Sequence, residues 1–186
     1  LVSQGIPLRR RQNNDIVNEI KYLVKNYKIK SLLFRDITWS MHRKETKELC
    51  KLIQEEEFDL DIGVETRADT LDEELILLMK KAGVKVVNLG IESPEDDILL
   101  NNGRRPIKEN KLEKVLKLLD RNNILVQGFY ILGLINDTKE TIEKTISYSK
   151  KINSFTAQFC VLTPFPGTKT FRELEHKLLT NDFSKF

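Results

Sequence analysis

Short apolar runs alternate with longer amphipathic segments five times along the chain, at a period of about 30 residues. The runs are rich in β-branched residues and end in polar residues, glycine or proline, which is typical of strands buried in a parallel sheet. We expect strands over residues 31–34, 60–65, 86–93, 124–132 and 157–162. The amphipathic segments predict helices over residues 14–27, 43–57, 70–83, 108–123, 138–152 and 169–179.

This alternation predicts an α/β fold, because strands that follow helices in turn are joined by right-handed crossovers into a parallel sheet. Two architectures remain open at this point, an open doubly wound sheet and part of a barrel. Local signals support the helix boundaries. Thr70 with Glu73 forms a candidate capping box, Gly83 ends that helix, and Asp137 or Thr138 caps the one over 138–152.

Polar residues and glycines gather where the predicted strands end. In a parallel sheet these positions lie on one edge, where such folds bind ligands. Carboxylates there can accept hydrogen bonds from ribose hydroxyls or an amino group, and an arginine can bind a carboxylate. The strand-end set comprises Asp36, Glu65, Arg67, Glu92, Ser93, Gly133 and residues 164–168.

Simpler structural roles compete with binding at each of these places. Asp36, Asp69 and Asp137 can be helix caps, and a glycine can simply relieve crowding between a strand and a helix. His42 and His176 are expected on the surface. The sequence shows no nucleophile–base pair, no phosphate-binding glycine loop and no cysteine–histidine metal motif. From the residues alone, the chain is an α/β ligand-binding domain.

Composition narrows the class of protein. With 186 residues and 40% hydrophobic content, residues 1–186 form one domain with a substantial core. A net charge of +3 does not indicate nucleic acid binding. Cys50 and Cys160 match no disulfide framework, and no apolar run reaches the length of a membrane span, so we expect a cytoplasmic protein.

Four segments, in this order and spacing, resemble the radical S-adenosylmethionine (SAM) enzymes. The resemblance is greatest to the branch whose members often carry a cobalamin-binding domain, with methylthiotransferases and Elp3-like proteins as relatives. It covers nearly the whole chain. The segments are Phe-Arg-Asp-Ile-Thr-Trp at 34–39, Glu-Thr-Arg-Ala-Asp at 65–69, Gly-Ile-Glu-Ser at 90–93 and Thr-Pro-Phe-Pro-Gly-Thr at 163–168.

The chain departs from the family pattern in two places. The family's Gly-Leu-Pro-Gly-Glu-Thr stands here as Gly-Leu-Ile-Asn-Asp-Thr at 133–138, which alters the turn. The family's Cys-x3-Cys-x2-Cys, which binds a [4Fe–4S] cluster, is absent, and neither Cys50 nor Cys160 can replace it. We therefore expect a fragment, strands two to six of a partial (βα)6 barrel, that begins after the cluster loop, is cut at its C-terminus and is inactive alone.

The resemblance implies that the parent protein uses a reduced [4Fe–4S] cluster to split SAM and form a 5′-deoxyadenosyl radical. It implies that Glu92 and Ser93 bind the SAM ribose or amino group and that Arg67 binds its carboxylate or holds the edge together. It also implies that backbone near Ile131 to Gly133 and near Val161 to Thr163 packs on adenine. Asp36 and Glu65 are expected to face the site, Asp36 with no assigned role.

The partners implied are SAM and an unidentified substrate, with cobalamin possible in the parent protein. An unpaired edge strand also makes self-association possible. The alternative function is a non-catalytic module on a complete doubly wound sheet, binding a nucleotide or a protein. A methylthiotransferase that modifies tRNA or a ribosomal protein is a third reading within the enzyme class.

Overall fold

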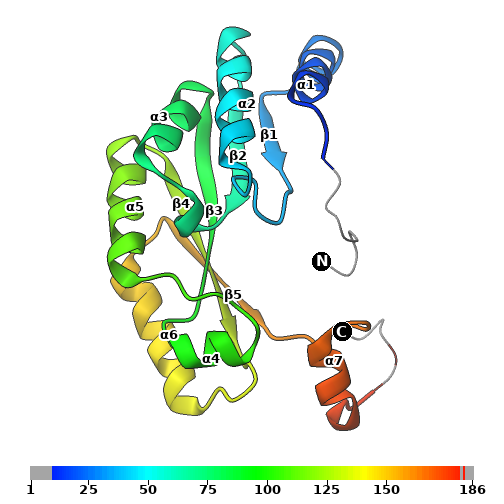
Figure 1. Ribbon diagram of the computed structural model, residues 1–186, viewed down its shortest axis with the longest axis vertical. Helices are drawn as coiled ribbons and strands as arrows, with labels where there is room; N and C mark the ends of the chain where they lie inside the picture. The colour runs from blue at the N-terminus through cyan, green and yellow to red at the C-terminus, as the bar shows by residue number, and fades with distance from the viewer. Residues whose placement is uncertain (1–9, 181, 183–186) are drawn as a thin grey trace.

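Five parallel strands form one sheet in the sequential order β1-β2-β3-β4-β5 (Figure 1). The structure, a computed structural model, describes residues 10–180 and 182. Each strand pairs with the next one in the chain, so the order never reverses as it must in a doubly wound sheet. The prediction of part of a barrel is confirmed, and the doubly wound alternative is wrong. The strands are β1 (Ser31–Phe34), β2 (Asp61–Thr66), β3 (Val84–Glu92), β4 (Leu125–Leu132) and β5 (Thr156–Val161).

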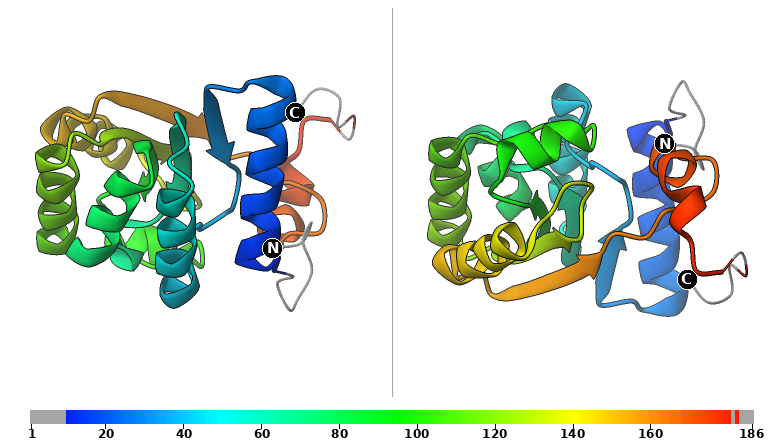
Figure 2. Two further views of the ribbon diagram at one scale, coloured as in Figure 1. Left: turned by 90° about the horizontal axis from the view of Figure 1, so that it is seen from above. Right: turned by 90° about the horizontal axis from the view of Figure 1, so that it is seen from below.

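Helices cover one face of this sheet. Helices α1, α2, α3 and α5 each contact the next in that series, and α6 packs on β4 (Figures 1 and 2). The helices are α1 (Asn13–Tyr27), α2 (Arg43–Glu55), α3 (Glu73–Lys81), α4 (Asp96–Asn101), α5 (Glu109–Arg121), α6 (Lys139–Ile152) and α7 (Lys169–Leu174), with 3-10 turns η1 (Ala68–Thr70) and η2 (Glu175–Lys177).

Strand alternation gives the sheet two different faces. Val64, Val87 and Leu89 are fully buried on the face that packs against the helices, where they join the main hydrophobic core. Side chains point alternately to opposite sides of a strand, so Glu65 and Asn88 belong to the other face. We call this second face the inner face. It holds the polar residues that the core excludes.

The N-terminus of α3 differs from the prediction. Thr70 lies in η1, and its hydroxyl donates to the Arg67 carbonyl at 2.7 Å. The helix cap is instead Asp72, whose carboxylate accepts from the Leu75 N–H at 2.7 Å. The capping box at Thr70 and Glu73 is therefore wrong. Gly83 does follow the helix, at φ +90, and Thr138 is the cap of α6.

Two helical segments also differ from the sequence pattern. The loop predicted between β3 and α5 contains α4, whose six residues are too few for a periodic signal. Ile98 and Leu99 of α4 pack with Leu134 in a small second core, which stabilises the helix. The last predicted helix ends early, at Leu174, and continues as η2. The sequence also predicts a loop over residues 1–12 and a turn-like tail over residues 180–186, and most of both lies outside the described residues.

Candidate functional site

The centre of the candidate site is the end of β3. The register of β3 with β4 is interrupted between Gly90 and Glu92, and Glu92 has φ +70. A non-glycine residue in this left-handed region is strained. The Glu92 carboxylate accepts from Arg104 Nη1 at 2.5 Å, and its side chain is 19% exposed. An accessible carboxylate is thus fixed at the sheet edge beside a guanidinium.

Arg104 reaches this position through the turn after α4. Its N–H donates to the Leu99 carbonyl at 2.8 Å, and Gly103 before it has φ +66, which a residue with a Cβ rarely adopts. From the sequence alone, Arg104 and Arg105 are expected either in solvent or in contact with phosphate or an anionic substrate. The sequence gives no signal of the contact with Glu92, because the two residues are 12 positions apart.

Ser93 points away from Glu92. It is buried, its hydroxyl lies 3.3 Å from that of Thr145 on α6, and it accepts from the Glu95 N–H at 3.2 Å. Ser93 therefore holds the turn between β3 and α4 against α6. Its contact with a ligand stays a prediction.

Arg67 and Glu65 are already paired on the β2 side. The Arg67 guanidinium binds both carboxylate oxygens of Asp69, at 3.0 and 3.2 Å, and donates to the Arg105 carbonyl at 2.8 Å. These bonds favour the edge-holding role of Arg67. Glu65 accepts from Arg35 at 2.5 Å. Asp69 binds Arg67 and is not a helix cap.

The end of β4 is tied to α4 by one side chain. Asn102 donates from Nδ2 to the Ile135 carbonyl and accepts at Oδ1 from the Ile135 N–H, both at 3.0 Å. Gly133, at φ +76, is exposed, with nothing within 4 Å of where a Cβ would stand. By contrast, a Cβ at Gly128 would lie 3.0 Å from both the Ser154 Oγ and the Tyr130 ring, so glycine at this position relieves crowding. Ile131 packs on the second core, and β5 continues the edge with Val161 and Thr163.

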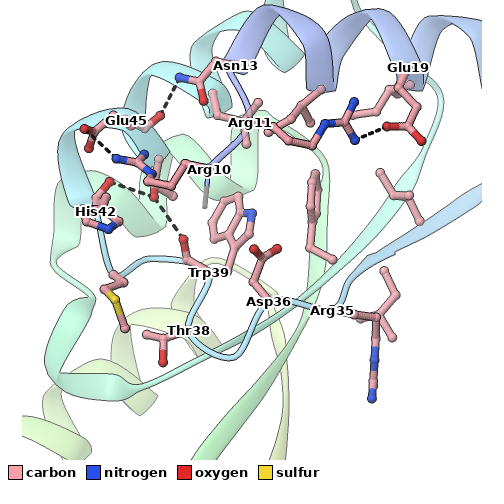
Figure 3. A pocket seen from close by; sticks show the side chains of 18 of the residues that line it. Arg10, Arg11, Asn13, Glu19, Arg35, Asp36, Thr38, Trp39, His42 and Glu45 are labelled. Carbon is pink, nitrogen blue, oxygen red and sulfur yellow. Dashed lines mark hydrogen bonds and ion pairs between the residues drawn. The ribbon is translucent and has the colours of Figure 1, made fainter. Parts of the chain in front are cut away.

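Asp36 lies in a different place, at a cavity of about 450 Å³ beside β1 (Figure 3). The cavity is bounded by α1, β1, the loop after β1 and α2, and the Asp36 side chain lies within it, close to Trp39. None of Glu65, Arg67 and Glu92 lines it. The predicted site residues therefore fall into two regions, Asp36 at this cavity and the others at the strand ends.

The described residues do not provide a metal-cluster site. No group of three or more histidine, cysteine, aspartate or glutamate side chains in residues 10–180 and 182 could hold a metal ion. Cys50 is buried in α2, and burial raises the pKa of its thiol to about 12. Cys160 is exposed on β5. The two cysteines do not fit a [4Fe–4S] cluster.

Comparison with known proteins identifies the family. The sequence pattern of the radical SAM superfamily matches residues 3–148. The chain belongs to the radical SAM superfamily. This radical SAM chain is 32% identical over 181 residues to the anaerobic magnesium-protoporphyrin IX monomethyl ester cyclase of Rubrivivax gelatinosus, covering 96% of this chain and 32% of the cyclase. It is 29% identical over 173 residues to an uncharacterized methyltransferase of Pyrococcus horikoshii, covering 92% of this chain and 38% of the methyltransferase.

Solved radical SAM structures share the fold. The radical SAM methyltransferase TsrM of Kitasatospora setae, with cobalamin and a [4Fe–4S] cluster bound, superimposes with a TM-score of 0.82 at 20% identity, covering 90% of this chain and 32% of that chain. Elp3 of Methanocaldococcus infernus gives a TM-score of 0.61 at 18% identity, covering 86% and 44%. The predicted superfamily is confirmed by the match over residues 3–148, and these structures confirm the predicted fold.

The radical SAM chain spans about a third of the length of the cyclase and the methyltransferase. Among the described residues, no helix combines the length and apolar content needed to cross a membrane.

Proposed function

We propose that this chain is the SAM-binding part of a radical SAM enzyme and that the carboxyl ends of β2 to β5 hold SAM. The observation that carries the proposal is the geometry of Glu92, a strained residue whose carboxylate is fixed beside Arg104. Strained backbone persists where the surrounding structure enforces it, and it clusters at functional sites. Pairing with one arginine does not by itself require this conformation.

Each residue of the edge then has a role. Glu92 accepts hydrogen bonds from the ribose hydroxyls or the ammonium group of SAM. The Arg104 guanidinium donates only through Nη1 among the described residues, so its other N–H groups can bind the SAM carboxylate. The open position at Gly133, with backbone near Ile131, Val161 and Thr163, receives adenine.

The remaining predicted residues support this edge. Arg67 holds the β2 end against residues 69 and 105, and Ser93 anchors the turn after Glu92. Bound SAM, with an electron from a [4Fe–4S] cluster, supplies the chemistry for hydrogen abstraction from a substrate. Use of cobalamin by the whole protein belongs to the same proposal, and resemblance to the cobalamin-carrying branch supports it.

SAM binding to the 186-residue chain, measured by isothermal titration calorimetry, tests the assignment. We expect Glu92→Gln to weaken binding about 10- to 100-fold, because a charge-assisted hydrogen bond contributes about 1.5–3 kcal/mol. Glu109→Gln is the matched control, since it removes a carboxylate that is paired with Lys151 at 2.6 Å and belongs to none of the strand ends. Equal SAM affinity in both variants would contradict the role of Glu92.

A second experiment addresses activity. The chain contains two cysteines, and neither has the spacing of the cluster motif. After anaerobic treatment with iron, sulfide and a reductant, we expect the chain alone to produce no 5′-deoxyadenosine from SAM. Production of 5′-deoxyadenosine by the chain would refute the prediction that it is inactive alone.

A further inference from the structure

A cluster of three hydroxyl groups joins the loop after β1 to the end of β2. Ser40 belongs to that loop and is 1% exposed, Thr66 ends β2 and is 3% exposed, and Thr70 is half-buried in η1. The Ser40 hydroxyl is hydrogen-bonded to that of Thr66 and, at 2.5 Å, to that of Thr70. The cluster therefore connects segments that lie 26 and 30 residues apart in the sequence.

The direction of each hydrogen bond in this cluster follows from the hydrogens available. A hydroxyl group donates one hydrogen bond. Thr70 uses its hydrogen on the Arg67 carbonyl, at 2.7 Å, so Ser40 is the donor to Thr70. Thr66 is then the donor to Ser40, and its oxygen also accepts from the Ser40 N–H at 3.4 Å. The hydrogen bonds run in one direction, from Thr66 through Ser40 and Thr70 to the Arg67 backbone.

Packing alone does not require hydroxyl groups at this place. Thr66 lies on the same face of β2 as Val64, which is fully buried in the main core. A valine at position 66 would fill the same volume without any hydrogen bond. A satisfied buried polar network instead specifies one arrangement of the groups that form it. The groups specified here are the path of η1 and the backbone of Arg67.

Arg67 carries this constraint to the SAM edge. Its guanidinium is held by both carboxylate oxygens of Asp69 and donates to the Arg105 carbonyl at 2.8 Å. Arg104, the residue before Arg105, donates to Glu92 at 2.5 Å. The backbone that positions Arg104 is thus bound to the Arg67 side chain, and the Arg67 backbone is bound to the hydroxyl cluster.

We propose that Ser40 is a positioning residue for the SAM site, acting on Arg104 through Thr70 and Arg67. The proposal rests on the proposed function, because it takes Arg104 and Glu92 to bind SAM. Ser40 is buried, so its effect on SAM is indirect. The loop has a second attachment, since the Trp39 N–H donates to the Glu65 carbonyl at 2.8 Å. Loss of the Ser40 hydroxyl should therefore loosen the position of Arg104 while the loop stays in place.

SAM titrations of Ser40→Ala and Ser149→Ala, by isothermal titration calorimetry, test the proposal. Both variants replace a buried serine, but the Ser149 hydroxyl donates to the Ile146 carbonyl of its own helix, at 2.7 Å. We expect Ser40→Ala to weaken SAM binding about 3- to 10-fold, the range for residues that act through a contact network, and Ser149→Ala to leave it unchanged. Unchanged SAM affinity in Ser40→Ala would overturn the proposal.

A double variant tests whether Ser40 acts through Arg67. In a chain that already carries Arg67→Met, Ser40→Ala should cause no further loss of SAM affinity, because the connection to Arg105 is already broken. A full additional loss in this background would show that Ser40 acts by another route and would refute the proposed path.

Thr66 provides a conservative pair of variants that does not depend on the folding of Ser40→Ala. Thr66→Ser keeps the hydroxyl and should retain the affinity for SAM. Thr66→Val keeps the volume but removes the hydroxyl, so it should weaken SAM binding by the same factor as Ser40→Ala. Equal SAM affinities in the two Thr66 variants would count against the hydroxyl cluster.

An NMR measurement without SAM separates this proposal from the proposed function. In a ¹H–¹⁵N spectrum, Ser40→Ala should shift the Arg67 Nε–H signal and the backbone amide signals of Arg104 and Arg105, whereas Ser149→Ala should not. Shifts confined to the residues that contact Ser40 would refute the positioning role. If the Arg104 signal shifts but the wild-type chain does not bind SAM, the SAM assignment fails and the coupling of Ser40 to Arg104 stands.

Discussion

Replacing Glu92 by glycine and by alanine measures the strain in its backbone. At φ +70 a residue with a Cβ costs about 1–2 kcal/mol relative to an ordinary conformation, and glycine avoids this cost. Glycine in turn loses about 0.5–1 kcal/mol through the greater freedom of the unfolded chain. We therefore expect Glu92→Gly to be about 0.5–1 kcal/mol more stable than Glu92→Ala.

Glu65 provides a closely matched control. Its side chain is also 19% exposed and is also paired with an arginine at 2.5 Å. Its φ is not in the left-handed region. Both substitutions at each position remove the ion pair, so the pair cancels from the glycine–alanine comparison. At Glu65 we expect glycine to be about 0.5–1 kcal/mol less stable than alanine.

Urea denaturation of the four variants gives the free energies of unfolding. The glycine–alanine difference should have opposite signs at the two positions. If glycine is the less stable substitution at both, Glu92 is not strained and the structural argument for its role is refuted. If the signs differ, Glu92→Gly should also lose SAM binding while keeping stability, as expected when a functional conformation costs free energy.

Two buried groups yield further predictions. The unfolded Cys50 thiol ionises near pH 9.0, whereas burial raises its folded pKa to about 12, so stability should fall as pH rises above 9.0. Urea denaturation should show a smaller fall in Cys50→Ala; an identical fall would contradict this. The buried Tyr130 hydroxyl makes no hydrogen bond of good geometry among the described residues, although the Ser154 side chain lies beside it. Tyr130→Phe should therefore leave the melting temperature unchanged or raise it, whereas Tyr130→Ala should cost about 3–5 kcal/mol. A marked loss in Tyr130→Phe would reveal a hidden partner.

The positions of the strands could be predicted from the sequence because the signal for a strand is local. The run at 31–34 matches β1 without error, and the other strands begin and end within two residues of the prediction. Apolar runs bounded by polar residues indicate which segments are buried strands, whereas they leave the strand order open between a doubly wound sheet and a barrel. Helix caps were less predictable, because Thr70 and Asp72 both carry side chains that can cap and only the path of η1 decides between them.

The candidate site was only partly predictable for a different reason. Glu65, Arg67 and Glu92 lie at or just after the ends of strands, so they meet at one edge of the sheet, as expected for parallel strands. Their partners come from loops and from neighbouring strands, and periodicity carries no information on such pairs. The contact of Arg104 with Glu92 depends on the turn after α4, which the sequence pattern did not reveal. The alignment of Glu65, Asn88 and Gln127 on three adjacent strands could not be predicted either, because it depends on the strand register.

The exposure of β5 has a consequence for how the molecule fluctuates. All six of its residues are exposed, Val161 by 74%, and within the part of the chain that the structure describes β5 pairs only with β4. Its amide protons should exchange with solvent through local opening, while those of β2 and β3, paired on both sides, exchange only in larger unfolding events. A ligand seated near Val161 and Thr163 would slow that opening. Ligand binding at this edge and the ordering of β5 are then thermodynamically coupled, so each favours the other.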